Sequence, residues 1–333
     1  PDYLPGYIRV TDEEGRSRFG EVWGVEPPDK PGLTLMEMIN GCGAEIRAMF
    51  IMGENPLMSD PDLNHVRKQL GRLDFLVVSE LFMSETAEMA DVVLPAASFA
   101  EKDGTFTATD RRVQRIRKAV EPIGESLPDW LIVSKISEGL GYPMDYEDPG
   151  EIMDELADLS PIYGGIRYPR LEEEGLRWPC PDPNHPGTRI LHRERFSRGL
   201  GKFQPIEYIP PAEEPDEEYP LILTTGRLLF HWHTGTMTRR SETLTDQVNV
   251  ARAEINPFDA EKIGVKNGDR IEVTSRRGSI SLEALVTSGI KEGVVFIPFH
   301  FAEAAANTLT NPALDPKAKI PELKVCAIRI RKK

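Results

Sequence analysis

One stretch of sixteen residues, GRLLFHWHTGTMTRRS at residues 226–241, concentrates side chains that could bind a polyanion. It holds two histidines, one tryptophan, three arginines and four threonine or serine hydroxyls. Arginine binds phosphate through a charge-assisted fork. Threonine and histidine add adaptable donors, and an aromatic side chain can pack against a ring. In a chain of net charge −14, this concentration of donors predicts a large polyanionic ligand.

The histidine pair of this stretch allows three interpretations. If the segment is extended, His231 and His233 share one face and Trp232 takes the other. The histidine face then contacts the ligand, or it packs inward with each ring satisfied by a backbone partner. Zinc binding by the pair is a third option, which the sequence disfavours because no further ligand is suitably spaced.

The cysteines encode no metal or disulfide framework. Cys42, Cys180 and Cys326 form no CxxC pair and are odd in number, so we expect neither disulfides nor a structural zinc or iron–sulfur site in this chain. Cys180 lies near His185, but the proline-rich context without a third partner favours a plain loop cysteine over a nucleophile. The cysteine usage predicts a reducing, cytoplasmic location.

Charge and hydropathy exclude several classes of protein. An acidic chain is a poor nonspecific binder of nucleic acid, and its acidic runs at 145–174 and 213–218 are expected to be solvated. No window reaches the ~18 apolar residues of a membrane span. The sequence starts PDYLPGYIRV, without a methionine or the pattern of a signal peptide, and we interpret it as a fragment or one half of a longer polypeptide.

The elements that position the chemistry begin with an α/β pattern. Buried strands are predicted at EIRAMFIM (45–52), FLVV (75–78) and DVVL (91–94). A helix is expected to start at Ser59-Asp60-Pro61, and a short one at 84–90. This alternation is typical of a parallel sheet with crossovers. Ligands bind beyond the carboxyl ends of such strands, where GENP (53–56) and Ser79-Glu80 follow two of them, although GENP could also be an ordinary turn.

The composition and the predicted elements change twice in the remaining chain. The polar loop at 101–119 carries four side chains that could hold anions or face solvent: Lys102, Thr105, Thr107 and Arg111. Helices are predicted at 129–140 and near 150–158, the second within a proline-rich and acidic surface connector. From residue 219, several short strands and a helix capped by Asn256 predict a closed β-barrel. We therefore expect an α/β part (1–127), a connector (128–215) and a barrel domain (216–333).

Several long blocks resemble a known family. Residues 75–114, FLVVSELFMSETAEMADVVLPAASFAEKDGTFTATDRRVQ, are similar to the cofactor-binding core of molybdopterin-guanine-dinucleotide oxidoreductases. TTGRLLFHWHTGTMTRRS (224–241) and PFHFAEAAANTLTNPALDP (298–316) resemble the carboxyl-terminal domain of their formate dehydrogenase catalytic subunits. The blocks occur in the family's order and together cover nearly the whole chain, which makes the resemblance specific.

The resemblance implies a fold and a set of site residues. It implies part of a Rossmann-like parallel-sheet domain followed by a double-psi β-barrel, which together hold two pterin guanine dinucleotides with molybdenum or tungsten. In the α/β part it places these residues at the cofactor: Gly53, Asn55, Ser59, Ser79, Glu80, Thr86 and Gly104. In the barrel it places these: Arg227, His231, His233, Thr234, Thr236, Phe299, His300, Asn307 and Lys324.

One departure from the family limits what this chain can do. The family's metal ligand (selenocysteine or cysteine), the histidine and arginine beside it and the cysteines of its 4Fe-4S cluster all precede the part that residue 1 resembles. We therefore expect no catalytic residue and no metal ligand here. The expected partners are an amino-terminal catalytic half and the iron–sulfur and electron-acceptor subunits of a complex.

The resemblance implies oxidation of formate to CO2, or the reverse, with electrons passed to iron–sulfur clusters. Another bis-pterin enzyme such as a nitrate reductase is the first alternative. A scaffold subunit that has lost the cofactor is the second, and the donor cluster at 226–241 argues against it. A stand-alone binding module without a partner polypeptide is the third, and gel filtration would test it, because a lone half-site exposes apolar surface.

Overall fold

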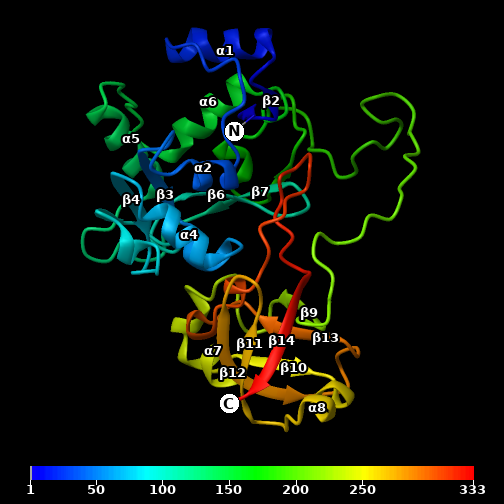
Figure 1. Ribbon diagram of the computed structural model, residues 1–333. Coiled ribbons are helices and arrows are strands. Elements are labelled where there is room, and N and C mark those ends of the chain that lie inside the picture. Colours follow the sequence, from blue (N-terminus) through cyan, green and yellow to red (C-terminus); the bar gives the residue numbers. More distant parts are fainter. Residues whose placement is uncertain (1) are drawn as a thin grey trace. The chain divides into compact units, whose positions relative to one another are not determined.

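The computed structural model describes residues 2–333, which form two compact units (Figure 1). One unit contains the chain up to Thr34 together with Leu94–Ile206, and the other contains Leu35–Val93 together with Glu207–Lys333. The division at residues 127/128 and 215/216 that we expect from composition stays a prediction.

The second unit starts with the α/β part. Its elements are α2 (Leu35–Gly41), β3 (Ala48–Met52), α3 (Pro56–Ser59), α4 (Leu63–Leu70), β4 (Phe75–Glu80), the 3-10 turn η1 (Ala87–Met89) and β5 (Val92–Pro95). Strands β3 and β4 pair in parallel from Ala48↔Phe75 to Met52↔Ser79, and β5 follows β4 in the sheet. Helices α2 and α4 bury Ile39, Val66 and Leu70 against this sheet's side chains. The carboxyl ends of β3 and β4 thus lie side by side.

The longer helix between β3 and β4, α4, begins later than its sequence pattern suggests. Ser59 ends α3, and the side chain of Asp62 accepts a hydrogen bond from His65 N (3.3 Å) to cap α4. The expected start at Ser59-Asp60-Pro61 is wrong, because a proline forces the preceding residue into an extended conformation. Asp60 has φ −83° and ψ 159°, so it separates two helices.

The barrel consists of six strands in a closed ring. The elements of this region are β9 (Leu221–Gly226), η3 (Thr238–Arg240), α7 (Glu242–Gln247), β10 (Arg252–Ile255), α8 (Pro257–Ile263), β11 (Arg270–Thr274), β12 (Ser279–Val286), β13 (Val294–Pro298), η4 (Ala302–Ala304), η5 (Ala306–Thr308) and β14 (Cys326–Lys332). The order around the ring is β10-β12-β11-β14-β9-β13. The pairs β9–β13 and β10–β12 are parallel, and the others are antiparallel. The expected fold, a parallel α/β part followed by a closed barrel, is confirmed.

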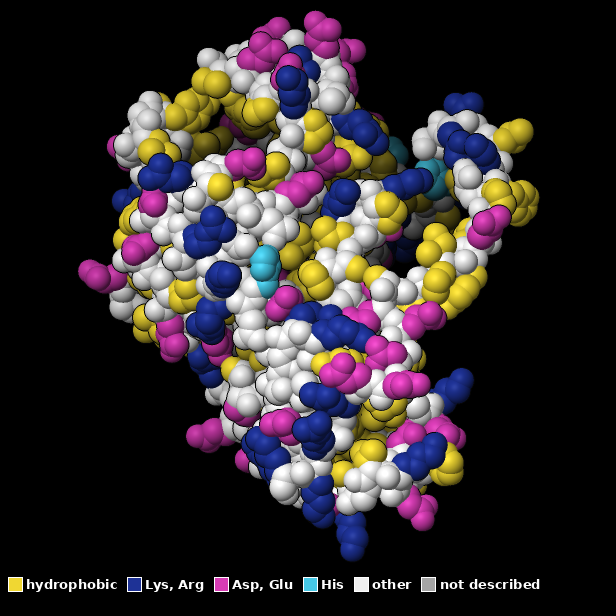
Figure 2. All heavy atoms as spheres, viewed as in Figure 1, with side chains coloured by type: hydrophobic (Ala, Val, Ile, Leu, Met, Phe, Trp, Pro, Cys, Tyr) yellow, Lys and Arg dark blue, Asp and Glu magenta, His cyan; other side chains and the backbone are white. Residues whose placement is uncertain are grey.

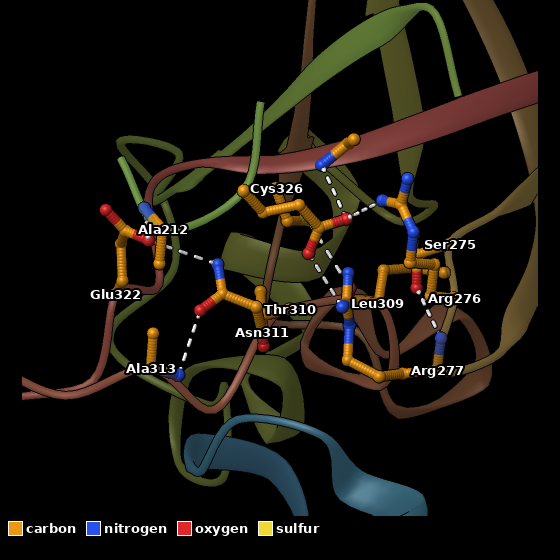
Figure 3. A network of polar contacts seen from close by, with 12 residues as sticks. Ala212, Ser275, Arg276, Arg277, Leu309, Thr310, Asn311, Ala313, Glu322 and Cys326 are labelled. Carbon is orange, nitrogen blue, oxygen red and sulfur yellow. Dashed lines mark hydrogen bonds and ion pairs between the residues drawn. The ribbon is translucent and has the colours of Figure 1, made fainter. Parts of the chain in front are cut away.

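A polar network fastens the chain that enters the barrel (Figure 3). Arg276 and Arg277, in the turn between β11 and β12, pair with Glu213 (2.5 and 2.7 Å). Arg277 Nε donates to Leu309 O (2.9 Å), and Asn311 Nδ2 donates to Glu322 (3.3 Å). Arg277 and Glu213 are both largely buried, so this pair holds the entering segment more firmly than a surface ion pair would.

The first unit combines helices with two small sheets. Its elements are β1 (Tyr3–Leu4), β2 (Ile8–Arg9), α1 (Glu13–Trp23), β6 (Gly104–Thr107), β7 (Arg112–Ile116), α5 (Asp129–Gly139), α6 (Pro149–Leu159), η2 (Tyr168–Leu171) and β8 (Leu176–Arg177). Met153, Ile166 and Cys180 form a core with Val113 of β7, so part of the expected surface connector is packed. The segment 189–218 that follows has no helix or strand.

The cations of the loop at 101–119 have protein partners. Lys102 forms an ion pair with Asp129 at the start of α5. Arg111 donates to the carbonyl oxygens of Trp178 and Thr188 (3.0 Å for Thr188). These contacts tie the β6–β7 hairpin to its neighbours. Among residues 2–333, none of the helices combines the length and the apolar character that a membrane crossing requires.

Candidate functional site

The loops after β3 and β4 are locked together by Asn55. This side chain is 5% exposed. Its Oδ1 accepts from Thr86 N (3.2 Å) and Thr86 Oγ1 (2.7 Å), and its Nδ2 donates to Glu85 (2.7 Å). Thr86 Oγ1 also accepts from Leu57 N (3.2 Å). A buried amide held by several hydrogen bonds rigidifies a site, so Asn55 and Thr86 fix the edge of the sheet at which GENP and the residues after β4 meet.

Two further predicted residues at this edge could accommodate a ligand, Gly53 because it leaves open space and Ser79 because its hydroxyl has no partner in residues 2–333. Gly53 adopts φ +62°, and a Cβ there would meet nothing within 4 Å. Ser79, at the end of β4, is fully buried, yet its Oγ has no hydrogen-bond partner in the described part of the chain. Its neighbour Glu80 is 8% exposed and accepts from Leu81 N (2.8 Å). A buried hydroxyl without a partner marks a place where a ligand or water completes the bonding.

Asp60, like Ser79, has a buried side-chain oxygen without a partner among residues 2–333. It is 4% exposed, and Ser59 Oγ donates to its Oδ1 (3.1 Å), while its Oδ2 has no partner among residues 2–333. Burial raises the pKa of Asp60 to about 6, against the opposing effect of the Ser59 bond. Compared with the unfolded chain, the folded protein therefore favours the neutral form of the Asp60 carboxyl group.

This preference predicts a pH dependence of stability. The folded protein binds a proton on Asp60 that the unfolded chain has released between pH ~4 and ~6, so stability falls as the pH rises through this window. A shift of about two units corresponds to ~3 kcal/mol. We expect Asp60→Asn to remove a loss of that order between pH 4 and pH 7 in urea unfolding. Asp246→Asn, on α7, should leave the loss unchanged, and an equal loss in Asp60→Asn and the wild type would contradict the assignment.

The stretch at 226–241 is folded back on itself, in contrast to the extended segment that we considered. After β9 the chain turns at residues 229–236, where His233 (φ +48°) and Gly235 (φ +78°) adopt left-handed conformations. At Gly235 a Cβ would lie 2.8 Å from His300 O. The close approach requires glycine, and it brings the hydroxyls of Thr234 and Thr236 together (3.1 Å).

The two buried histidines of the barrel support this loop. His231 Nε2 lies 2.7 Å from Val248 O, and its Nδ1 lies 3.4 Å from Thr238 Oγ1. His300 is fully buried, and its Nε2 accepts from Leu228 N (2.8 Å), so Nδ1 carries the proton and donates to His233 O. Burial lowers the pKa of His300. The ring of His231 is thus held by protein partners, which is the inward-packing arrangement that the sequence left open, whereas His233, the other histidine of that predicted pair, is exposed.

Cations gather where β9 and β13 end. The Arg227 guanidinium stacks on the exposed Trp232 ring (4.6 Å to the centroid). Lys324 Nζ donates to Thr225 O (2.6 Å) and lies 5.8 Å from the Phe299 ring centroid. Burial, and after it the charge of Arg227, lower the pKa of Lys324. The positive charges of Arg227 and Lys324 repel each other, and an anion bound between them relieves this repulsion.

A cleft of about 340 Å³ opens beside this loop. Its walls contain the predicted residues Thr234, Thr236 and His300, and also four polar residues that the sequence did not single out: Ser84, Glu85, Arg239 and Arg240. Arg239 forms a bidentate pair with Glu303 (2.8 and 2.8 Å), and Arg240 stacks on Phe82 (4.5 Å). Both arginines stand within the donor-rich stretch, and that signal could have identified them.

Asn307 joins the barrel to the α/β part within this unit. It is 3% exposed, and its Nδ2 donates to Met58 O (2.9 Å) and Ser59 O (3.0 Å) at the end of α3. Its Oδ1 is buried and has no partner among residues 2–333. Asn64 adds a bond to Arg277 O (3.0 Å). Asn307 of the predicted barrel residues therefore contacts Ser59 of the predicted α/β residues.

One predicted residue belongs to the other unit, and residues 2–333 contain no metal-binding cluster. Gly104 begins β6 in the other unit. In residues 2–333, no group of three or more His, Cys, Asp or Glu side chains is arranged to hold a metal ion. Cys42, Cys180 and Cys326 are free thiols, each buried.

Comparisons with known proteins match this architecture. A molybdopterin oxidoreductase model matches residues 17–139, and a molydopterin dinucleotide binding domain model matches residues 221–327, which include β9 to β13 and the donor-rich stretch. The F420-dependent formate dehydrogenase subunit alpha of Methanocaldococcus jannaschii is 53% identical over 336 residues, spanning 100% of this chain.

The chain carries a molybdopterin oxidoreductase domain and a molydopterin dinucleotide binding domain.

Further relatives match the whole chain but extend well beyond it. Formate dehydrogenase H of Escherichia coli is 37% identical, and the assimilatory nitrate reductase catalytic subunit of Bacillus subtilis is 39% identical, each over 99% of this chain. The chain spans about half the length of these relatives (50% for M. jannaschii, 47% for the other two). Acetylene hydratase from Pelobacter acetylenicus shares the fold, with a TM-score of 0.71, 18% identity and coverage of 96% of this chain and 50% of its own.

The residues present fit the dinucleotide group of the molybdopterin oxidoreductases. Three observations carry this fit: the buried atoms Ser79 Oγ and Asn307 Oδ1, which have no partner in the described residues 2–333, the open space at Gly53, and the cation cluster of Arg227 and Lys324. Pyrophosphate needs cations and N–H groups, and the pterin and guanine rings need both donors and acceptors. The donor set supplies all of these.

Proposed function

We propose that this chain is the cofactor-binding portion of a formate dehydrogenase catalytic subunit that interconverts formate and CO2. The 53% identity with the formate dehydrogenase alpha subunit of M. jannaschii over the whole chain carries the proposal. The donor cluster at the ends of β3, β4 and β9 supports it, because these loops present groups suited to a phosphate-bearing pterin.

The residues of this chain bind and orient the cofactor in the proposal. Arg227, Lys324 and Arg240 neutralise phosphate charge, while Ser79, Glu80 and Asn307 offer hydrogen bonds to ring heteroatoms. Asn55, Thr86, His231 and His300 hold the loops in place. Oxidation of formate to CO2 releases one proton and two electrons, and the metal–pterin group supplies this redox chemistry when it is bound.

The proposal extends to cofactors and partners. We infer two pterin guanine dinucleotides, molybdenum or tungsten as the metal, and a 4Fe-4S cluster held by polypeptide other than this chain. That polypeptide also supplies the metal ligand, and further iron–sulfur and electron-acceptor subunits receive the electrons. We place the complex in the cytoplasm, on the cysteine usage of this chain.

A direct test uses the purified complete enzyme. We expect formate-dependent reduction of a viologen dye, together with about one molybdenum or tungsten atom by plasma mass spectrometry and two guanine nucleotides after acid release. The 39% identity with a nitrate reductase subunit makes nitrate the informative second substrate. Nitrate reduction without formate oxidation would replace the proposal with that alternative, and absence of pterin and metal would refute both.

A further inference from the structure

The unit that contains α1, α5 and α6 has a large apolar groove outside the site described above. The groove has a volume of about 970 Å³. Its walls are formed by Phe19 and Trp23 from α1, Trp130 and Val133 from α5, and Ile152 and Leu156 from α6. Figure 2 shows the hollow at the upper left, between α1 and α5, with hydrophobic side chains around it. A groove of this volume, lined mostly by apolar side chains, is large enough to receive part of a partner.

A hydrogen-bonded clamp preforms the groove. Glu155 of α6 accepts from Trp23 Nε1 (2.8 Å) and from Tyr146 Oη (2.7 Å). Tyr142 Oη donates to Trp23 O (2.7 Å). These bonds hold α1, α6 and the loop after α5 at fixed positions. The groove is therefore preformed, and binding of its occupant involves little entropic cost from ordering the groove.

The charges of the groove define its occupant. Its lining residues include four carboxylates, Glu26, Asp129, Asp145 and Glu155, and no lysine or arginine. Glu26 lies near Arg16 (3.6 Å) and Asp129 pairs with Lys102, both from outside the lining. Asp145, on the rim, is exposed, and no residue in the range 2–333 pairs with its side chain. The complement is an apolar segment that carries a lysine or arginine opposite Asp145.

The comparisons indicate where such a segment comes from. The relatives named above are about twice as long as the part of them that this chain matches. The molybdopterin oxidoreductase model covers residues 17–139, so most of α1 and all of α5 lie in a matched domain. Half of each relative thus has no counterpart here, while two walls of the groove belong to the shared domain.

We propose that this groove seats an amphipathic helix from the half of the enzyme that this chain does not match. A trough between three helices suits a fourth helix, whose apolar residues recur at i, i+3, i+4 and i+7 and enter the groove. A basic side chain beside its apolar face meets Asp145. The inference rests on the proposed function only in requiring a further polypeptide half, and it is independent of formate chemistry.

The test co-expresses this 333-residue chain, carrying an affinity tag, with the half of the M. jannaschii alpha subunit that it does not match. We expect the two polypeptides to copurify, and Val22→Glu plus Val133→Glu to reduce the copurified half at least tenfold. Both valines line the groove and are exposed (58% and 38%), so the charges disturb binding and not the core. Leu140→Glu is the control, because Leu140 is 82% exposed and lies outside the groove.

A second experiment measures the accessibility of the groove carboxylates directly. Carbodiimide labelling with mass spectrometry should find Asp145 protected in the complex and modified in the isolated chain. No copurification with the wild-type chain would overturn the proposal, and so would equal recovery with the groove variant. A wild-type chain that dimerises alone, and becomes monomeric in the groove variant, would show that a second copy is the occupant. These outcomes do not depend on pterin or formate, so they are distinct from failure of the proposed function.

Discussion

Arg227→Ala should abolish cofactor retention and activity together. The guanidinium stands at the end of β9, stacked on Trp232 and close enough to Lys324 to lower the pKa of that amine. Removing a charge-assisted fork to a phosphate costs ~2–3 kcal/mol of binding, which corresponds to a loss of affinity of about 30- to 150-fold. We expect the purified enzyme to lose most of its metal and guanine nucleotide, and formate-dependent dye reduction to fall by at least the same factor.

Two variants separate this effect from a loss of structure. Arg227→Lys keeps the charge but not the fork, and it should retain an intermediate cofactor content. Arg331→Ala removes an exposed arginine near the end of β14 and should leave cofactor content unchanged. Full metal and pterin content in Arg227→Ala would count against the assignment of the site.

Phe301→Ala should cause the largest loss of stability in the barrel. The Phe301 side chain is fully buried, its ring meets the His231 ring edge-on at 5.6 Å, and the Arg239 guanidinium lies 4.6 Å above it. Truncating a buried phenylalanine to alanine costs ~3–5 kcal/mol. We expect a decrease of that size in the free energy of unfolding from urea titration, accompanied by faster amide hydrogen exchange in residues 228–240, which this ring supports.

The matched control for this prediction is Phe258→Ala on α8. Phe258 is 49% exposed and packs mainly against Lys262 (3.9 Å to the ring centroid). We expect a change below ~1 kcal/mol, as is usual for surface positions. If both substitutions changed the stability equally, Phe301 would not be the support of the loop.

Local patterns in the sequence were sufficient for most individual elements. Asn256 caps α8 by accepting from Phe258 N (3.0 Å), as its position before a proline predicts. The alternation over residues 270–286 corresponds to the buried positions of β11 and β12. α5 spans Asp129–Gly139, close to the predicted 129–140. Such elements follow from periodicity and capping, which act over a few residues.

The arrangement of the site depends on contacts that no local pattern contains. His300 binds Leu228 N and His233 O, 72 and 67 positions away in the sequence. Those bonds fold residues 226–236 back, whereas the sequence left an extended segment open. Arg239 and Arg240 reach the cleft only because of that reversal. Asn307 likewise meets Met58 across 249 positions. Pairings at such separations become visible only in the three-dimensional structure or through a family resemblance.

The position of β14 in the ring constrains how the barrel forms. β14 lies between β11 and β9, and it pairs with both. Before Cys326–Lys332 have been synthesised, β9 and β11 therefore keep open edges, and the parallel partners β9 and β13 already bridge about seventy residues. Contacts of this separation slow folding, and unpaired edges invite aggregation. If translation ends before the final strand, the released chain has unpaired edges on β9 and β11. Production of this domain therefore depends on uninterrupted translation through residue 332.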